Sequence, residues 1–268
     1  MIQPDKKLHN ADFSSGVRSV ERALELLEQL SASGGATLSQ LARDTRLPVS
    51  TCHRLLTTLQ GRGFVHYDHS SWRWVIGARA LAVGATFANA RDIVGLARRI
   101  MRRVARESGE IVNLGAASGD EILFLNRIDP HAPTMARSSS ATFIPVHCSS
   151  IGKAILAGLH EREVQDIIGK APLSSRTEKS ITRRKHLLAD LRVCGQRGFA
   201  VDDEENTPGL RCVAAPIFDE FCRPIAAISI AASTERLCGE HIGAFGRLVI
   251  AASRDITAAC GGVAPQRH

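Results

Sequence analysis

Apolar residues recur every three or four positions near the start of the chain, which is the period of an amphipathic helix. The stripe consists of Val17, Val20, Leu24, Leu27 and Leu30. A glycine pair at residues 34–35 follows, and glycine commonly ends a helix. The pattern therefore predicts an amphipathic first helix that begins near residue 17 and ends before this pair.

Two further helices and a tight turn are predicted directly after the glycine pair. Thr37 can cap a short helix over residues 38–44, and residues 45–48 form the turn. The third helix begins near Ser50, close to its cap position, and runs to about residue 60. A short helix, a short turn and a second helix are the components of a helix-turn-helix. An ordinary three-helix bundle is the alternative.

The predicted third helix has one apolar and one polar side at 100° per residue. The apolar side consists of Cys52, Leu55, Leu56 and Leu59. The polar side consists of Ser50, His53, Arg54 and Thr57. Arg54 can contact a guanine edge or a phosphate, and Ser50 and Thr51 suit phosphate or base contacts. We expect this helix to enter the major groove of DNA with its amino end first.

Two short β-prone runs follow within residues 64–77, separated by the polar stretch 68–71. Such a pair predicts a β-hairpin, the wing of a winged helix-turn-helix, although the hairpin could also be incidental. Trp72 and Arg73 lie at its tip, where we expect contact with the sugar-phosphate backbone or the minor groove. Residues 17–77 are thus predicted to form a DNA-binding domain, preceded by a flexible tail over residues 1–16.

A helical pattern returns over residues 78–108 and predicts one long linker helix. Its apolar positions are Leu81, Val83, Phe87, Ile93, Leu96, Ile100 and Val104. Its arginines are Arg91, Arg98, Arg99, Arg102, Arg103 and Arg106. We favour a solvated helix face that pairs with acids elsewhere, because these arginines lie beyond the wing. The alternative is that they add to the positive field that faces DNA.

From residue 109 the chain alternates between strand-like and helical segments. Strands are predicted at residues 111–116, 121–128, 143–146, 199–202, 210–218 and 224–232. Helices are predicted at residues 149–157, 161–169, 182–195 and 239–260. Sheet strands interrupted by helices are typical of an α+β domain. We place this second domain at residues 109–262.

Three features of the second domain could carry chemistry. The helix start at Ser150, Ile151 and Gly152 presents free backbone N–H groups, which suit an anion such as a carboxylate. Four acids at residues 202–205 come directly before a turn, and a strand end can direct one of them inward. Cys212 and Ser229 occupy apolar-facing positions on neighbouring predicted strands. The alternatives are simple capping, solvated acids and satisfied core residues.

An enzyme is the alternative function, because Ser150 and Lys153 match the S-x-x-K motif of penicillin-binding enzymes. The companion motifs S-D-N and K-T-G do not occur later in the chain, and neither do H-E-x-x-H, a P-loop or G-x-G-x-x-G. A hydrolase-like metabolic enzyme with an accessory DNA- or anion-binding arm is therefore kept only as the alternative. We predict no catalytic residue, no metal site and no cofactor.

Charge is distributed unevenly along the 268 residues. The whole formal net charge of +7 lies in residues 1–107, and residues 108–268 are neutral. Such asymmetry indicates an acidic partner, such as nucleic acid, for the first part. Residues 17–77 alone carry only +2, so the third helix must supply the selectivity.

Composition narrows the protein class further. With 44% hydrophobic residues the chain can fold. Its seven cysteines include no C-x-x-C pair, so neither a disulfide framework nor a zinc ribbon is indicated. The start is polar, and no apolar run approaches the roughly 20 residues that span a bilayer. We therefore expect a cytoplasmic protein without a membrane partner.

Several segments together form a specific signature. They are VRSVERALELL at 17–27, LPVSTCHRLLTTL at 47–59, HCSSIGKAIL at 147–156, GFAVDDEE at 198–205 and GLRCVAAPIFD at 209–219. In this order they resemble the IclR family of bacterial transcriptional regulators, over residues 17 to about 262. AAISI at 226–230 and the glycine pair at 261–262 are similar to the isocitrate-lyase regulator branch of that family.

The resemblance implies a winged helix-turn-helix domain, a linker helix and a GAF-like effector-binding domain. It further implies homodimers or dimers of dimers on double-stranded DNA with palindromic operators, and a small carboxylate effector that changes operator affinity. By position, the effector pocket would be lined by Ser150, Ile151, Gly152, Asp202, Cys212 and Ser229. We therefore predict a sequence-specific transcriptional regulator that acts as a repressor.

The chain departs from the isocitrate-lyase regulator branch at two places in this pocket. Where the branch has Gly-Ala, this chain has Ser150 and Ile151. Where the branch has a second serine, this chain has Ala231. The pocket is therefore predicted to be smaller at one wall and to have one hydroxyl fewer, which changes the ligand that it accepts.

Overall fold

The structure is a computed structural model that describes residues 17–89, 93–131, 143–169 and 172–265. The predicted tail over residues 1–16 lies outside the described residues. The chain divides into two compact units, and the boundary follows Phe87. Each unit has its own apolar core. The described helices include none that is long and apolar enough to cross a membrane.

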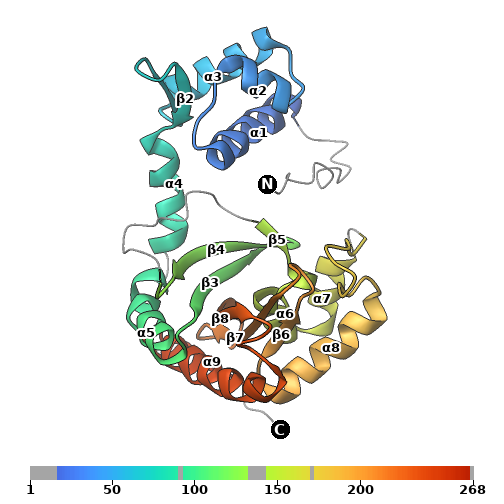
Figure 1. The fold of residues 1–268 in the computed structure, drawn as a ribbon. Coiled ribbons are helices and arrows are strands. Elements are labelled where there is room, and N and C mark those ends of the chain that lie inside the picture. The colour runs from blue at the N-terminus through green and yellow to red at the C-terminus, as the bar shows by residue number, and fades with distance from the viewer. Residues whose placement is uncertain (1–16, 90–92, 132–142, 170–171, 266–268) are drawn as a thin grey trace. The chain divides into compact units, whose positions relative to one another are not determined.

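The first unit is a winged helix-turn-helix. Its elements are α1 (Arg18–Ser33), α2 (Leu38–Asp44), α3 (Val49–Gly61), β1 (Val65–Asp68), β2 (Arg73–Ile76) and α4 (Ala78–Asn89) (Figure 1). Thr37 caps α2 as predicted: its hydroxyl accepts from the backbone N–H of Gln40, whose side chain accepts from the backbone N–H of Thr37 at 2.9 Å. Pro48 is the N-cap of α3, so Ser50 lies inside the first turn rather than at the cap.

The apolar stripe of α1 is buried only in part within its own unit. Leu26 and Leu30 are buried in the core. Val17, Val20 and Leu24, by contrast, are 65%, 54% and 52% exposed. The three-and-four spacing therefore marks a real apolar face, but much of that face does not contact the rest of its own unit.

The described residues of the predicted linker helix lie in two helical segments. After α4, the helix α5 (Ile93–Ser108) begins, and the residues between them lie outside the described part of the chain, as does the side chain of Phe87. α5 belongs to the second unit, because Ile93, Ala97 and Met101 are buried in the core beneath the large sheet. The 3.6-residue period continues across the boundary between units, which is why the pattern alone predicted one helix.

The second unit is an α+β domain, as predicted. Its antiparallel strands are β3 (Ile111–Ser118), β4 (Glu121–Ile128), β5 (Phe143–Pro145), β6 (Ala200–Asp203), β7 (Leu210–Phe218) and β8 (Pro224–Ser233). They form one sheet in the order β5-β4-β3-β8-β7-β6. A short 3-10 helix, Val146–Cys148, follows β5.

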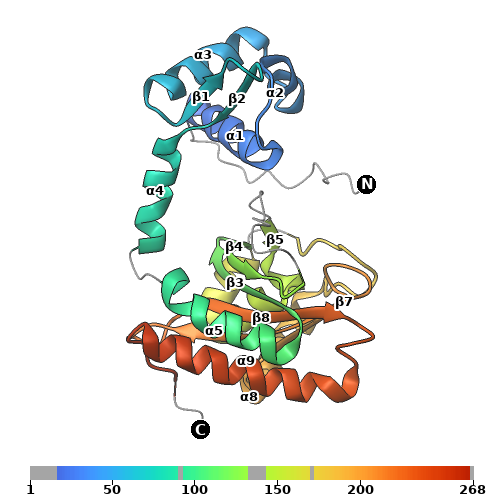
Figure 2. The same cartoon turned by 60° about the vertical axis from the view of Figure 1, so that its left-hand side comes forward.

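Helices cover both faces of this sheet (Figures 1 and 2). α5 and α9 (Gly239–Ala259) pack on one face, and the other face carries α6 (Ser150–Ala157), α7 (Glu161–Ile168) and α8 (Arg184–Arg197). The sheet therefore separates two apolar layers, and α6 lies directly on it.

The arginines of α5 lie mainly in solvent. Arg98, Arg99, Arg102 and Arg106 are exposed. Arg103 donates a hydrogen bond to Asp255 of α9 at 2.5 Å. Both observations agree with the solvated face that we favoured, and Arg91 lies outside the described residues.

Candidate functional site

The side of α3 that was predicted to contact DNA is exposed to solvent. Ser50, His53, Arg54 and Thr57 are all exposed, and Thr51 is half-buried. On the opposite side, Cys52 and Leu56 are fully buried in the core of the first unit. α3 is thus held by its apolar side and presents a small, polar and basic side, which is the arrangement of a recognition helix.

The wing tip also places its two predicted residues in solvent. Trp72 is 70% exposed and has a φ of 56°, which is an uncommon backbone conformation for a bulky residue. The turn is held by Asp68, whose carboxylate accepts from the backbone N–H of Ser70 at 2.9 Å and from the Ser71 hydroxyl at 2.5 Å. These hydrogen bonds lower the pKa of Asp68, and the bond from Ser71 has the largest effect. The tip is therefore fixed and presents the Trp72 indole and the exposed Arg73 side chain.

The start of α6 is tightly built. Ser149 caps the helix by accepting from the backbone N–H of Gly152 at 3.0 Å. Gly152 has no room for a side chain, because a Cβ there would lie 2.1 Å from the backbone oxygen of Val146. The predicted ligand residue Gly152 therefore shapes the helix start through close packing. Ser150 and Ile151 beside it are buried.

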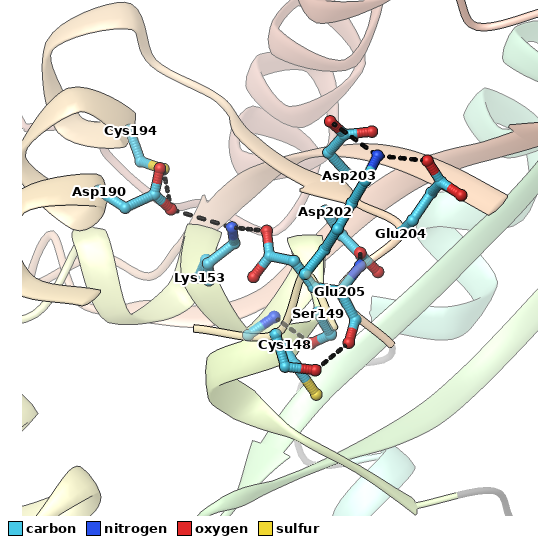
Figure 3. A network of polar contacts seen from close by, with 12 residues as sticks. Cys148, Ser149, Lys153, Asp190, Cys194, Asp202, Asp203, Glu204 and Glu205 are labelled. Carbon is cyan, nitrogen blue, oxygen red and sulfur yellow. Dashed lines mark hydrogen bonds and ion pairs between the residues drawn. The ribbon is translucent and has the colours of Figure 1, made fainter. Parts of the chain in front are cut away.

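The three predicted residues of the sheet lie on one face of it. Asp202 of β6 pairs with Cys212 of β7, and Ser229 of β8 lies in the next row. Cross-strand partners point to the same face of a sheet, and Ala200 and Ala214, in the row of Ser229, pack in the same apolar layer as α6. The structure thus brings Asp202, Cys212 and Ser229 together beneath α6. Figure 3 shows Asp202 in the same region as Cys148 and Ser149, directly before α6.

Asn113 is a further polar residue of this face that the sequence analysis missed. It lies on β3, is buried, and pairs directly with Ser229. Within the described residues, Asn113, Ser150 and Ser229 make no side-chain hydrogen bond to each other or to other residues, so their polar groups can bind a ligand. The signal was a lone amide in an otherwise apolar predicted strand.

Ile151 occupies part of the space above this face. Its Cδ1 lies 3.3 Å from the place that a Cβ on Gly115 of β3 would take. Gly115 thus allows the isoleucine to approach the sheet closely. This contact is consistent with the smaller pocket that we expected from Ile151.

Lys153 forms a buried ion cluster with two carboxylates (Figure 3). Its side chain is 1% exposed, and its Nζ bonds to Glu205 Oε1 and lies 2.9 Å from Asp190 Oδ2. Burial alone would lower the pKa of Lys153, but Glu205 and Asp190 raise it above its usual value. Both partners of the lysine are thus carboxylates that favour the ammonium form, an arrangement that does not favour a neutral lysine base for Ser150.

Asp202 is held next to this cluster. Its pKa is raised to about 7, mainly by burial and to a lesser extent by the charge of Glu205. The backbone N–H of Glu205, which donates to Asp202 Oδ1 at 2.8 Å, and the Lys153 ammonium act in the opposite direction. Asp202 thus changes its charge near neutral pH, at a position where a carboxylate ligand would meet either an acid or an anion.

We expect the change Asp202→Asn to remove a pH dependence of stability. The folded-state pKa of Asp202 is raised, so the folded chain binds a proton that the unfolded chain has lost, and this stabilisation fades as pH rises through 7. Relative to Asp202→Asn, the wild-type chain should therefore lose roughly 1 to 2 kcal/mol between pH 5.5 and pH 8. Urea unfolding at both pH values, followed by far-UV circular dichroism, measures the difference. An equal pH dependence in both proteins would contradict the raised pKa.

The described residues contain no group of three His, Cys, Asp or Glu side chains that could hold a metal ion. What the site offers instead is hydrogen-bonding groups: a helix start, two hydroxyls, an amide and a carboxyl group that titrates near pH 7. Such a set suits a small organic acid.

Comparisons with known proteins agree with this geometry. A family model described as the bacterial transcriptional regulator IclR C-terminal domain matches residues 85–258, and one described as the IclR helix-turn-helix domain matches residues 19–69. The Transcriptional repressor IclR of Escherichia coli K12 is 38% identical, over 94% of this chain and 93% of its own. The regulator BhcR of Paracoccus denitrificans is 35% identical, over 96% and 91%.

A solved structure has the same fold. It is an IclR homologue from Microbacterium hydrocarbonoxydans complexed with 4-hydroxybenzoate. It matches with a TM-score of 0.76 and 23% identity, over 91% of this chain and 99% of its own. The two family models match the two domains in this order, and the two relatives align with nearly the whole chain. The chain belongs to the IclR family of bacterial transcriptional regulators.

Proposed function

We propose that this regulator is a repressor that binds a palindromic operator through α3 and releases it in response to a small carboxylate. The DNA-binding part of this proposal rests on the two different sides of α3. One side is buried in the core, and the other presents Ser50, His53, Arg54 and Thr57 to solvent. Such a protein acts on DNA in the cytoplasm. Its family and relatives are transcriptional regulators, so we propose a regulator and not an enzyme.

A gel shift with the DNA upstream of the protein's own gene tests this proposal. We expect a specific complex that survives excess competitor DNA and weakens steeply as salt rises, because phosphate contacts release counterions. A scrambled sequence of equal length is the matched control. Equal affinity for both DNAs across several candidate upstream regions would overturn the operator proposal.

A homodimer is the simplest assembly for a palindromic operator, because its two-fold axis mirrors that of the DNA. The first unit exposes apolar side chains that suit such an interface. Val20 and Leu24 of α1 and Leu81 of α4 are 54%, 52% and 75% exposed. We propose that these exposed residues are covered by a second copy of the chain, and that dimers of dimers can form from it.

Leu24→Glu should therefore weaken the dimer, because it places a charge in an apolar contact. We expect a shift towards monomer in light scattering coupled to size exclusion, and at least about a tenfold loss of operator affinity. Val193→Glu is the matched control, since Val193 of α8 in the other unit is 47% exposed. An unchanged dimer in Leu24→Glu would remove α1 from the interface.

The effector is proposed to bind between the start of α6 and the sheet. In support, Asp202, Cys212, Ser229 and Asn113 lie on one face of the sheet, and the buried Ser150 begins the helix that packs on it. A carboxylate suits the helix start, and the IclR homologue solved with 4-hydroxybenzoate holds a ligand of this class. A preference of about 1 to 3 kcal/mol for one arrangement of the dimer would change operator affinity about 5- to 150-fold.

A thermal-shift screen of the full chain with short aliphatic and aromatic carboxylates tests the effector site. A ligand that binds the folded state raises the Tm. We expect a carboxylate that raises the Tm of the wild-type chain, raises that of Ser229→Ala much less, and weakens the operator complex. A ligand with equal effects on both proteins would contradict the proposed lining.

A further inference from the structure

A cavity of about 410 Å³ lies in the second unit, away from the candidate effector site. Its wall includes Ala157 and Gly158, where α6 ends, and Gly195 near the end of α8. None of the six predicted effector residues lines it. At about 1.5 Å of rise per residue, the two ends of α6 are roughly 10 Å apart. The cavity is thus a separate place in the same domain.

The cavity exists because the sheet edge is open there. β6 pairs with β7 only as far as Ala214, so on that side the last residues of β7, including Pro216 and Phe218, have no strand partner among the described residues, while β8 pairs with them on the other side. α9 satisfies part of this edge: the Ser253 hydroxyl donates to the backbone oxygen of Pro216 at 2.5 Å. The edge is therefore held open and does not require another strand to be stable.

The lining is apolar with a single cation. Most of the wall consists of alanine, glycine, proline, phenylalanine and isoleucine, and no acidic residue contributes to it. Arg254 of α9 is its one charged residue, and the described residues include no ion pair to it. The neighbouring Asp255 is engaged by Arg103 at 2.5 Å. An apolar space of this size with one guanidinium selects an organic anion with an apolar body.

The wall is also fixed in place. Cys194 of α8 is buried, and its Sγ lies 3.8 Å from Asp190 Oδ2 and 3.5 Å from the Arg197 guanidinium. Asp190 is in turn held by Lys153 (Figure 3). A pocket whose wall is already ordered loses little conformational freedom when a ligand enters.

We propose that this cavity is a second ligand site, which binds a monocarboxylate with an aliphatic or aryl body. The apolar body lies against α6, α8 and the open edge of β7. The carboxylate lies at the Arg254 guanidinium. This site is independent of the effector site and of operator binding.

The structure offers a substitution that places a side chain in the cavity with no close contact at its Cβ. A Cβ on Gly195 would contact only the backbone oxygen of Ala157, at 3.8 Å, and Gly195 lies inside the helix α8. Gly195→Leu therefore adds a side chain into the space at a position where glycine itself lowers helix stability. Arg254→Gln removes the cation from an exposed helix position and leaves the fold intact.

Calorimetric titration of the full chain with octanoate tests the proposal. We expect binding to the wild-type chain, at least about tenfold weaker binding to Gly195→Leu and to Arg254→Gln, and unchanged binding to Ser229→Ala. Octan-1-ol, which lacks the charge, should bind wild type and Arg254→Gln equally. Urea unfolding checks that both variants fold.

Three results would overturn the second site: no heat of binding with the wild-type chain, equal octanoate affinity in all variants, or loss of binding in Ser229→Ala alone. The last result would place octanoate in the effector site. A failure of this kind leaves the operator gel shift unaffected, so the two proposals fail separately.

Discussion

Lys153→Met should destabilise the folded chain by about 3 to 5 kcal/mol, because it removes the positive partner of a buried ion cluster. Glu205 would then remain buried with a negative charge, and its second oxygen already has no hydrogen-bond partner. Asp190 would lose its 2.9 Å contact but is 28% exposed, so water can compensate part of that loss. Both tryptophans lie in the first unit, so urea unfolding is best followed by far-UV circular dichroism.

The chain provides its own control for this experiment. Lys179 also contacts two carboxylates, Asp203 at 3.8 Å and Glu204, but its side chain is 51% exposed. Exposed ion pairs contribute only about 0 to 1 kcal/mol, so Lys179→Met should change stability little. If both substitutions cost the same, burial does not set the strength of the Lys153 cluster.

A double substitution separates the loss of the pair from the loss of the lysine side chain. Combined with Glu205→Gln, Lys153→Met no longer leaves a full charge buried, so we expect part of the lost stability to return. Additive losses in the double variant would mean that Lys153 and Glu205 do not interact. Because Glu205 donates its backbone N–H to Asp202, the same cluster positions a predicted effector residue.

Local periodicity predicted the recognition helix well, because the information is contained in consecutive turns. The buried and exposed sides of α3 follow from residues at most ten positions apart, and Cys52 and Leu56 are buried where the pattern places them. The same method says less about α1. Periodicity finds an apolar face but cannot state what covers it, and Val20 and Leu24 are uncovered within their own unit.

The effector site could be predicted only in part from the sequence, because it depends on contacts between residues that are far apart in the chain. Lys153 and Glu205 are 52 residues apart, so their ion pair depends on how β6 and α6 meet. The row that joins Ser229 to Asn113 depends on the register between β3 and β8. Predicted strands without their order give no register, and Asn113 was missed for that reason.

Arg54→Ala should weaken binding to the operator by about 1 to 3 kcal/mol, which is roughly 5- to 150-fold. Arg54 lies on the exposed side of α3, and the described residues include no ion pair to its guanidinium, so the substitution leaves the fold intact. Alanine is also a good helix former. The loss should appear in the ratio of operator affinity to scrambled-DNA affinity, because a base contact is made only with the correct sequence.

Arg62→Ala is the matched control for this measurement. It carries the same charge and is exposed, but it lies at the C-cap of α3, at the opposite end from the part that enters the groove. Arg62→Ala should lower affinity for operator and scrambled DNA by the same factor, and at most reduce the salt dependence by about one phosphate contact. If Arg54→Ala also lowers both affinities equally, Arg54 contacts the backbone only, and the selectivity of this regulator must come from its neighbours on α3 or from the wing.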